Sequence, residues 1–147
     1  MNAKFMTEAI KEAKAAAFEN EVPVGAVIVK NGEIIAKERN RREKNNDATA
    51  HAELLAKKKA CKKLNSWRLN DCELYVTLEP CPMCAGAIIN SRIKTVVFGA
   101  FDKKGGAVES KVDLFSKGFN HKPEIYGGVC EKECAELLKK FFEEKRK

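Results

Sequence analysis

Apolar residues at helical spacing near the start of the chain give way to short, continuous apolar runs. The first of these patterns predicts an amphipathic helix that ends at Asn20, and its apolar positions are Met6, Ala9, Ile10, Ala13 and Ala17. The run over residues 22–29 is too short and too rich in β-branched residues for a buried helix, so it predicts a strand. Residues 30–33 (KNGE) have the composition of a hairpin turn. We therefore expect a second, antiparallel strand over residues 34–36.

The rest of the chain alternates between helix and strand patterns. We expect a helix over about residues 50–63, a strand over 74–78, a helix from Pro82 to Asn90 and a strand over 95–98. Right-handed crossovers of this kind build a mixed or parallel sheet with helices on both faces. No linker, low-complexity tract or repeat interrupts the pattern. The sequence therefore predicts an α/β fold, with residues 1–147 as one domain.

A last helix is predicted over about residues 131–145. One of its faces is expected to pack on the core or on another subunit, and it carries Cys134, Leu137, Leu138 and Phe141.

The composition fits a globular protein with a highly charged surface. Apolar residues make up 44% of the chain and charged residues 33%, which fits neither a disordered nor a collagen-like chain. No run approaches the roughly 18 apolar residues of a membrane span. Charged residues interrupt positions 1–20, which argues against a secretory signal. We therefore expect no membrane association and a cytoplasmic location.

The chain has six cysteines, namely Cys61, Cys72, Cys81, Cys84, Cys130 and Cys134. An even number would suit the disulfide framework of a small secreted protein, but we expect no secretory signal here, and the chain has enough apolar residues for a core. In such a chain, a Cys-x-x-Cys pair is more typical of a metal or redox site than of a disulfide.

The strongest candidates for chemistry are residues 49–53 (TAHAE) and 80–84 (PCPMC), each at a predicted helix start. One histidine and two thiolates suit zinc, and three protein ligands leave one tetrahedral position open for water, as in a catalytic site. Amide N–H groups at a helix N-terminus would stabilise the thiolates. We therefore expect His51, Cys81 and Cys84 to bind a catalytic zinc ion.

Glu53 follows His51 by two residues. In the middle of a helix this spacing would turn the two side chains roughly 200° apart, but the first turn of a helix relaxes that constraint. A carboxylate that reaches a zinc-bound water without ligating the metal can take its proton and deliver it to a substrate. We expect Glu53 to be this general acid/base.

Other interpretations of the two segments stay open. Cys-x-x-Cys alone could be redox-active or half of a structural zinc site. A structural site would need a fourth ligand, and the available residues are Cys61, Cys72, His121, Cys130 and Cys134. By default, we expect these five to be packed thiols and a hydrogen-bonded histidine.

His-x-Glu followed by Pro-Cys-x-x-Cys is the signature of zinc-dependent nucleobase deaminases. The chain also resembles the bacterial tRNA adenosine deaminase family along nearly its whole length. The segments that carry this resemblance are residues 21–29 (EVPVGAVIV), 49–53, 74–99, 102–106 (DKKGG), 119–122 (FNHK) and 137–146.

The resemblance implies a three-layer α/β/α cytidine-deaminase-like fold with a central mixed sheet of about five strands. It further implies a homodimer with one zinc ion per subunit and conversion of adenosine to inosine at the wobble position of a tRNA anticodon. His51, Cys81 and Cys84 match the zinc ligands of the family, and Glu53 matches its proton shuttle.

The resemblance also assigns residues that contact the RNA. Asn40 matches a residue that hydrogen-bonds the flipped base, and Val24 matches an apolar wall against that base. The remaining matches are expected near the flanking nucleotides or the anticodon loop, and they are Asp102, Phe142, Lys145 and Arg146.

Two departures from the family pattern lie beside the expected RNA groove. Residues 109–111 are Glu-Ser-Lys where the family commonly has Gly-Ser-Leu, and Phe101 replaces a residue that is polar or charged in some members. Both bear on which bases flank the target, and neither touches the metal ligands.

Charge gives separate support for an RNA partner. The net charge is +7, and basic residues gather in three clusters, which are Arg39, Arg41, Arg42 and Lys44; Lys57, Lys58, Lys59, Lys62 and Lys63; and Lys139, Lys140, Lys145, Arg146 and Lys147. Any one such run is also typical of a solvated surface. Three of them favour contacts with phosphates, and a tRNA loop offers unpaired bases that cost little to flip.

Two other functions stay open on the sequence. One is a deaminase of a free nucleobase or nucleoside, such as guanine or cytosine. The other is a zinc-stabilised RNA-binding module without activity, in which Glu53 would only cap a helix.

Overall fold

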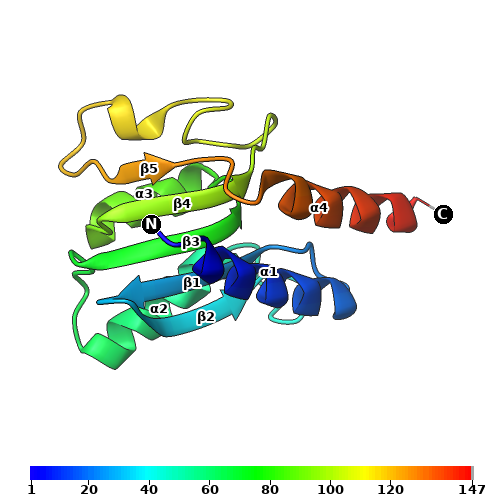
Figure 1. Cartoon of the computed structure of the whole chain (residues 1–147), viewed down its shortest axis with the longest axis horizontal. Coiled ribbons are helices and arrows are strands. Elements are labelled where there is room, and N and C mark those ends of the chain that lie inside the picture. Colours follow the sequence, from blue (N-terminus) through cyan, green and yellow to red (C-terminus); the bar gives the residue numbers. More distant parts are fainter. Residues whose placement is uncertain (147) are drawn as a thin grey trace.

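The central element of the structure, a computed structural model that describes residues 1–146, is a five-stranded mixed sheet (Figure 1). The elements in chain order are α1 (Ala3–Phe18), β1 (Gly25–Lys30), β2 (Glu33–Arg39), α2 (Ala52–Leu64), β3 (Cys72–Leu78), α3 (Pro82–Ser91), β4 (Thr95–Ala100), the short 3-10 helix η1 (Leu114–Ser116), β5 (Glu124–Tyr126) and α4 (Glu131–Lys145).

The strand order is β2-β1-β3-β4-β5. β1 pairs antiparallel with β2 and β3, whereas β3, β4 and β5 run parallel to one another. Neighbouring parallel strands end at the same edge of a sheet, and ligands of α/β proteins bind there. The segments that follow β3 and β4 therefore begin side by side, and they carry Cys81 and Asp102.

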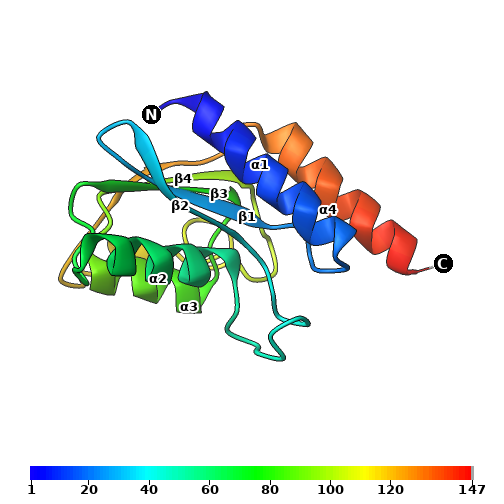
Figure 2. The same ribbon diagram turned by 90° about the horizontal axis from the view of Figure 1, so that it is seen from below.

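Helices cover both faces of the sheet (Figure 2): α1 and α4 lie on one face, and α2 and α3 on the other. Strand residues alternate between the two layers, as the pleat requires. On β1, for example, Val27 and Val29 pack in the cluster with α1, whereas Ala26 and Ile28 pack in the cluster with α2 and α3. The predicted three-layer α/β/α fold with a mixed sheet of about five strands is confirmed.

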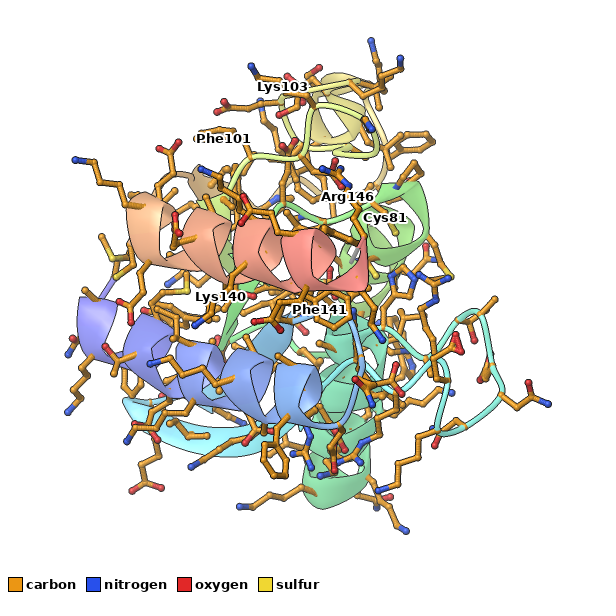
Figure 3. All side chains as sticks on the ribbon, turned by 90° about the vertical axis from the view of Figure 1, so that its right-hand side faces the viewer. Cys81, Phe101, Lys103, Lys140, Phe141 and Arg146 are labelled. Atoms are coloured by element: carbon orange, nitrogen blue, oxygen red, sulfur yellow. The ribbon has the colours of Figure 1, made fainter. Side chains whose placement is uncertain are left out.

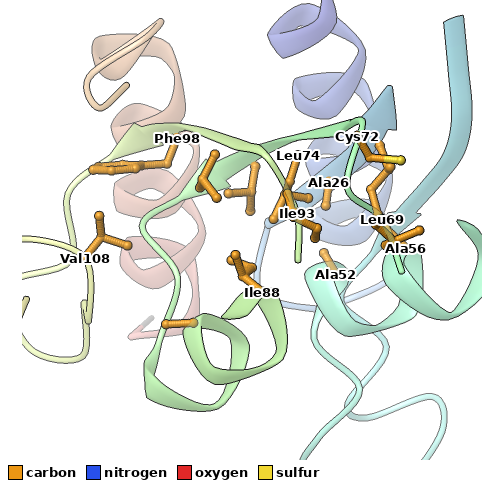
Figure 4. Packing of buried hydrophobic residues seen from close by; sticks show 14 of the residues in the cluster. Ala26, Ala52, Ala56, Leu69, Cys72, Leu74, Ile88, Ile93, Phe98 and Val108 are labelled. Carbon is orange, nitrogen blue, oxygen red and sulfur yellow. The ribbon is translucent and has the colours of Figure 1, made fainter. Parts of the chain in front are cut away.

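The larger apolar cluster fills the space between the sheet and the α2–α3 layer (Figure 4). Small residues on α2, such as Ala52 and Ala56, let this helix approach the sheet closely, and Leu74 on β3 and Phe98 on β4 contribute large side chains to the cluster. The N-termini of α2 and α3, which carry the candidate ligands, therefore rest on a packed support.

The hairpin and the last helix match the predictions. Asn31 and Gly32 both have positive φ (52° and 76°), as a two-residue hairpin turn requires. On α4, Cys134 is buried, while Leu137, Leu138 and Phe141 are only half-buried, so this face is not fully covered by the core.

Several predicted boundaries of helices and strands were wrong. α2 begins at Ala52 rather than near residue 50, because His51 still has extended backbone and stands as its N-cap. The first strand begins at Gly25 rather than at residue 22, and β2 continues to Arg39. β5 and η1 had no specific prediction, since both are only three residues long.

Within residues 1–146, no helix is both long and apolar enough to cross a bilayer. Lys147, the last member of the third basic cluster, lies outside the described residues.

Candidate active site

Two helix N-termini meet at the site. His51 is the N-cap of α2 and Cys81 is the N-cap of α3, where Pro82 occupies the first turn. Neither N-cap side chain bonds to the backbone of its own helix, so the imidazole and the thiol are available for other partners. Cys84, in the first turn of α3, is fully buried.

The side chains of His51, Cys81 and Cys84 converge, with their candidate ligand atoms all within 4.8 Å of one another. His51 Nδ1 lies 3.7 Å from Cys81 Sγ and 3.6 Å from Cys84 Sγ. Tetrahedral zinc, with Zn–N and Zn–S bonds of about 2.0 and 2.3 Å, would place such atoms about 3.5 Å apart. The three residues thus form a group that could hold a metal ion, and its donors and spacing fit zinc.

Without a metal, the pKa values of the Cys81 and Cys84 thiols shift in opposite directions. Hydrogen bonds from Cys84 and His51 lower the pKa of Cys81 to about 4. The pKa of Cys84 is raised, because its thiol donates to Cys81 and is buried. The hydrogen bond to Cys81 also raises the pKa of His51. Since thiolates bind metals, uptake of an ion here would release the Cys84 proton.

Glu53 lies in the first turn of α2 and is only 6% exposed. Because His51 is outside the helix proper, both side chains can face one pocket, and both line it. Burial raises the pKa of Glu53 to about 7. A carboxyl group with such a pKa can both accept and donate a proton at neutral pH.

Asn40, just after β2, connects two parts of the site. Its Oδ1 accepts the backbone N–H of Ala52 at 2.8 Å, and its Nδ2 donates to the carbonyl oxygen of Val22 at 3.2 Å. The Oδ1 contact takes the place of the helix cap that His51 does not provide. Asn40 therefore holds the start of α2 while its side chain lines the pocket.

A pocket of about 780 Å³ joins these residues. Of the residues predicted to contact substrate, it is lined by Val24, Asn40, Asp102 and Phe142. Lys145 lines a neighbouring pocket of about 440 Å³, which shares Phe142 with the first. Arg146, the C-cap of α4, is exposed and lines neither pocket. The structure thus brings all the predicted contacts except Arg146 to the lining of two neighbouring pockets.

The rim of the pocket comes from α4 and from the loop that follows β4. Figure 3 shows Phe101 and Lys103 on this loop along one side of α4, and Phe141 on the side toward α1. Lys104 and Arg42 add positive charge to the lining. Phe101, a departure from the family pattern, is 37% exposed and packs edge-on against Phe98, with ring centroids 5.1 Å apart.

The other cysteines and His121 do not join the metal group within residues 1–146. All six cysteines are free thiols; Cys72 and Cys134 are buried, and Cys61 and Cys130 are half-buried. His121 Nε2 lies 2.6 Å from the carbonyl oxygen of Ile93. This arrangement favours a site with three protein ligands over a structural site with four.

Sequence reasoning missed Glu79, a carboxylate that is 1% exposed and lines the pocket. A signal was present, since an acidic residue directly after an apolar strand and before Pro80 must find partners if it is buried. The position of the loop that supplies those partners was not readable from the local sequence.

Comparison with known proteins gives one consistent result. The family described as MafB19-like deaminase matches residues 1–146. The tRNA-specific adenosine deaminase of Bacillus subtilis (strain 168) is 55% identical over 144 residues, which cover 97% of this chain and 89% of that protein.

Solved structures agree with the sequence relatives. A structure from a study of A-to-I editing by tRNA:A34 deaminases at the wobble position superposes with a TM-score of 0.91 at 48% identity, covering 93% of this chain and all of that one. A guanine deaminase from Bacillus subtilis gives a TM-score of 0.67 at 44% identity, covering 78% of this chain and 74% of that one. On these matches, the chain belongs to the tRNA-specific adenosine deaminases, within the MafB19-like deaminase family.

Proposed function

We propose that this protein is a zinc-dependent enzyme that converts adenosine to inosine by hydrolysis at the wobble position of a tRNA anticodon. The observation that carries the proposal is the convergence of His51, Cys81 and Cys84 beside the buried carboxyl group of Glu53, in a pocket lined by Asn40. Membership of the tRNA-specific adenosine deaminases supplies the substrate class.

His51 Nδ1 and the thiolates of Cys81 and Cys84 would hold the zinc ion. Three protein ligands leave one tetrahedral position for water or substrate. When bound, zinc lowers the pKa of a coordinated water from 15.7 to about 7 and so makes hydroxide available at neutral pH. The lowered pKa of Cys81 favours the thiolate form, which captures the ion.

Glu53 moves the protons of the reaction. It takes the proton of the attacking water, delivers it to the ring nitrogen beside the reacting carbon, and then helps to protonate the departing amine. Its burial keeps its pKa near neutrality, so the accepting and donating forms lie close in free energy. In the net reaction, one water molecule is added and one ammonia molecule is released.

Asn40 and Val24 orient the flipped base. Oδ1 of Asn40 is occupied by the N–H of Ala52, and one N–H of Nδ2 is donated to Val22. The second N–H of the amide would donate a hydrogen bond to an acceptor atom of the base. Val24 is 4% exposed and adds an apolar wall.

The rim favours RNA over a free base. Arg42, Lys103 and Lys104 would contact phosphates on either side of the flipped nucleotide. Phe142, 44% exposed, and the half-buried Phe141 offer faces on which neighbouring bases could stack. Asp102 lines the same pocket and Lys145 lines its neighbour, and we propose that both contact the RNA. Arg146, exposed at the end of α4 outside both pockets, is proposed as a more distant contact. A free base would use only the floor of the pocket.

A second candidate function is deamination of a free base such as guanine. It is favoured by the similarity to the Bacillus subtilis guanine deaminase, but that match covers less of the chain and superposes less well than the tRNA deaminase structure.

We further propose that the protein acts as a homodimer in the cytoplasm. On α3, Met83 is 36% exposed, and the half-buried Gly86 and Ala87 follow it by three and four residues on the same side of the helix. They give α3 an apolar outer surface suited to a partner subunit. Light scattering of the zinc-loaded protein would test the dimer, because a monomer mass at micromolar concentration contradicts it.

The proposed cytoplasmic location is supported by the six free thiols, which suit a reducing compartment.

The function is tested by offering the zinc-loaded protein an anticodon stem-loop with adenosine at the wobble position, and separately free guanine, cytosine and adenosine. Inosine in the stem-loop alone supports the proposal. Deamination of a free base alone supports the second candidate, and no product from any substrate supports an inactive binding module.

A further inference from the structure

Glu79 is the most deeply buried acidic side chain near the pocket, and the metal chemistry gives it no role. It follows β3 and lies two residues before Cys81. A buried carboxylate costs several kcal/mol unless hydrogen bonds compensate for lost hydration, so its partners indicate what it does.

Within residues 1–146, the hydrogen-bond partners of the Glu79 carboxylate all lie in the loop that follows β4. Oε1 accepts the backbone N–H of Asp102 at 3.0 Å and the hydroxyl of Ser110. Oε2 accepts three successive backbone N–H groups, from Val108 at 3.1 Å, Glu109 at 2.7 Å and Ser110 at 2.9 Å. The Glu79 side chain thus accepts five hydrogen bonds, from donors at both ends of a single loop.

The backbone around Glu79 ties the same loop to the metal-binding segment. Glu79 N–H donates to the carbonyl oxygen of Ala100 at 2.9 Å, and Ala107 N–H donates to that of Pro80 at 2.8 Å. Gly106 passes so close that a Cβ atom there would collide with the Glu79 carboxyl group. The loop therefore closes around the carboxylate directly beside Cys81.

Between its two tethered ends, the loop forms a wall of the pocket. Asp102, Lys103, Lys104 and Gly105 all line the pocket. Asp102 Oδ1 accepts the N–H groups of Lys104 and Gly105, each at 3.1 Å, which shapes the turn between the two anchors. The position of this wall relative to Cys81 is set by the bonds to Glu79.

We propose that Glu79 is a positioning residue for RNA recognition, which fixes the loop over residues 102–110 as the wall that contacts nucleotides beside the target base. This inference rests on the proposed function. All five partners donate to the two oxygens of Glu79, which is the arrangement that a carboxylate requires. The proposal also gives Ser110 a role, although residues 109–111 depart from the family pattern. The hydroxyl and the backbone N–H of Ser110 both donate to the Glu79 carboxylate.

The test compares Glu79→Gln with Glu109→Gln. A glutamine at position 79 has the same shape, but whichever way its amide turns, at least two loop donors face an NH₂ group instead of an oxygen. Glu109 lies on the same loop with an exposed side chain, so Glu109→Gln removes the same charge, leaves its backbone N–H to Glu79 intact and is the control for hydrogen exchange. Because Glu109 lies in the proposed wall, the control for KM is Glu33→Gln, which removes an exposed carboxylate at the start of β2.

Two measurements are made on the zinc-loaded proteins. Hydrogen exchange of the Val108, Glu109 and Ser110 amides is expected to accelerate in Glu79→Gln and not in Glu109→Gln, while β3 and β4 stay protected. With an anticodon stem-loop, Glu79→Gln is expected to raise KM about tenfold or more and to change kcat less than about threefold, because the loop binds substrate while the metal group and Glu53 stay in place.

Unchanged exchange at the three amides, an unchanged KM, or loss of kcat together with zinc would overturn the inference. If Glu79→Gln does not fold, Ser110→Ala removes one of the five bonds and must raise KM in the same direction for the inference to stand. If wild type makes no inosine, the proposed function fails, and the exchange measurement still decides whether Glu79 anchors the loop.

Discussion

The side-chain oxygen of Asn40 accepts the backbone N–H of Ala52 at 2.8 Å, one residue after His51. A residue expected to contact the base therefore also caps the helix that presents a candidate metal ligand. The two roles use different atoms of one amide, because the cap needs an acceptor and the base contact needs an N–H donor.

This division predicts different results for two substitutions at position 40. Asn40→Asp keeps an oxygen for Ala52 and loses both N–H donors, so zinc content should hold while kcat/KM for the stem-loop falls. A lost hydrogen bond of about 1–3 kcal/mol corresponds to a fall of roughly 5- to 150-fold. Asn40→Ala also removes the cap, so its melting temperature should drop as well. Equal activity in wild type and Asn40→Asp would argue against the base contact.

The role of Glu53 predicts a loss of chemistry without a loss of metal. Glu53→Gln keeps the size of the side chain but cannot carry the proton, and general acid–base catalysis contributes about 10²- to 10⁴-fold. Single-turnover rates should fall in that range, with zinc measured by atomic absorption at the wild-type level. A variant that retains zinc and more than a few per cent of the wild-type rate would contradict the role.

The metal group predicts that two of the six cysteines differ from the others. Cys81→Ser and Cys84→Ser should lose zinc and activity, whereas Cys61→Ser, at a half-buried thiol outside the group, should retain both. Chelation of wild type should abolish activity, and added zinc should restore it. Full activity in the chelated protein would show that the reaction does not need the metal.

A buried carboxylate, Glu38, that pairs with two more exposed cations predicts how stability falls in acid. The side chain of Glu38 is 8% exposed, and its oxygens lie 2.8 Å from Arg41 Nε and 2.9 Å from Lys59 Nζ. Burial alone would raise its pKa, but hydrogen bonds from Lys59, Arg41 and the Arg39 backbone give a net lowering from 4.5.

Because the folded-state pKa lies below the ordinary value, the ionised Glu38 stabilises the fold above about pH 4.5, and this stabilisation is lost as the pH falls through the lowered pKa. Glu38→Gln should therefore cost about 1–3 kcal/mol at pH 7, with a difference from wild type that shrinks toward pH 3. Urea unfolding at both pH values measures it. Glu33→Gln, at an exposed position on the same strand, should show no such difference; a constant cost of Glu38→Gln across this range would refute the assignment.

The basic rim predicts how RNA binding responds to salt. If Arg42 contacts a phosphate, Arg42→Ala should weaken stem-loop binding and reduce the slope of log K against log salt by about one. Lys94 is exposed just before β4, at the opposite edge of the sheet from the pocket, and Lys94→Ala should leave the slope unchanged. A slope near zero for wild type would contradict phosphate contacts altogether.

The sequence was sufficient for the features that depend on local spacing. The His-x-Glu and Cys-x-x-Cys segments fall at helix starts, where the first turn brings residues two or three apart to one side. The convergence of His51, Cys81 and Cys84, and the place of Glu53 in the same pocket, could therefore be predicted before the fold was known. Strand and helix alternation likewise indicated the three layers. β5 was not predicted, because the three residues Glu124–Tyr126 are too few to show the alternation of apolar and polar positions typical of a strand.

The interactions that depend on chain segments far apart could not be predicted in this way. Ala52 and Asn40 are 12 residues apart and meet only because the end of β2 lies beside the start of α2. The donors to Glu79 are 23 to 31 residues away and depend on the pairing of β3 with β4. The partners of Glu79 could not be identified for the same reason, because they are mostly backbone groups that leave no mark in the local sequence.

Selection of the wobble adenosine is tested by mapping the product position after a single turnover of zinc-loaded protein on an anticodon stem-loop. The substrate carries adenosine at the wobble position and a second adenosine elsewhere in the loop, and mass spectrometry of nuclease fragments locates inosine. We expect inosine at the wobble position alone. Equal conversion of both adenosines, or no inosine from a preparation that converts free guanine to xanthine, would contradict it.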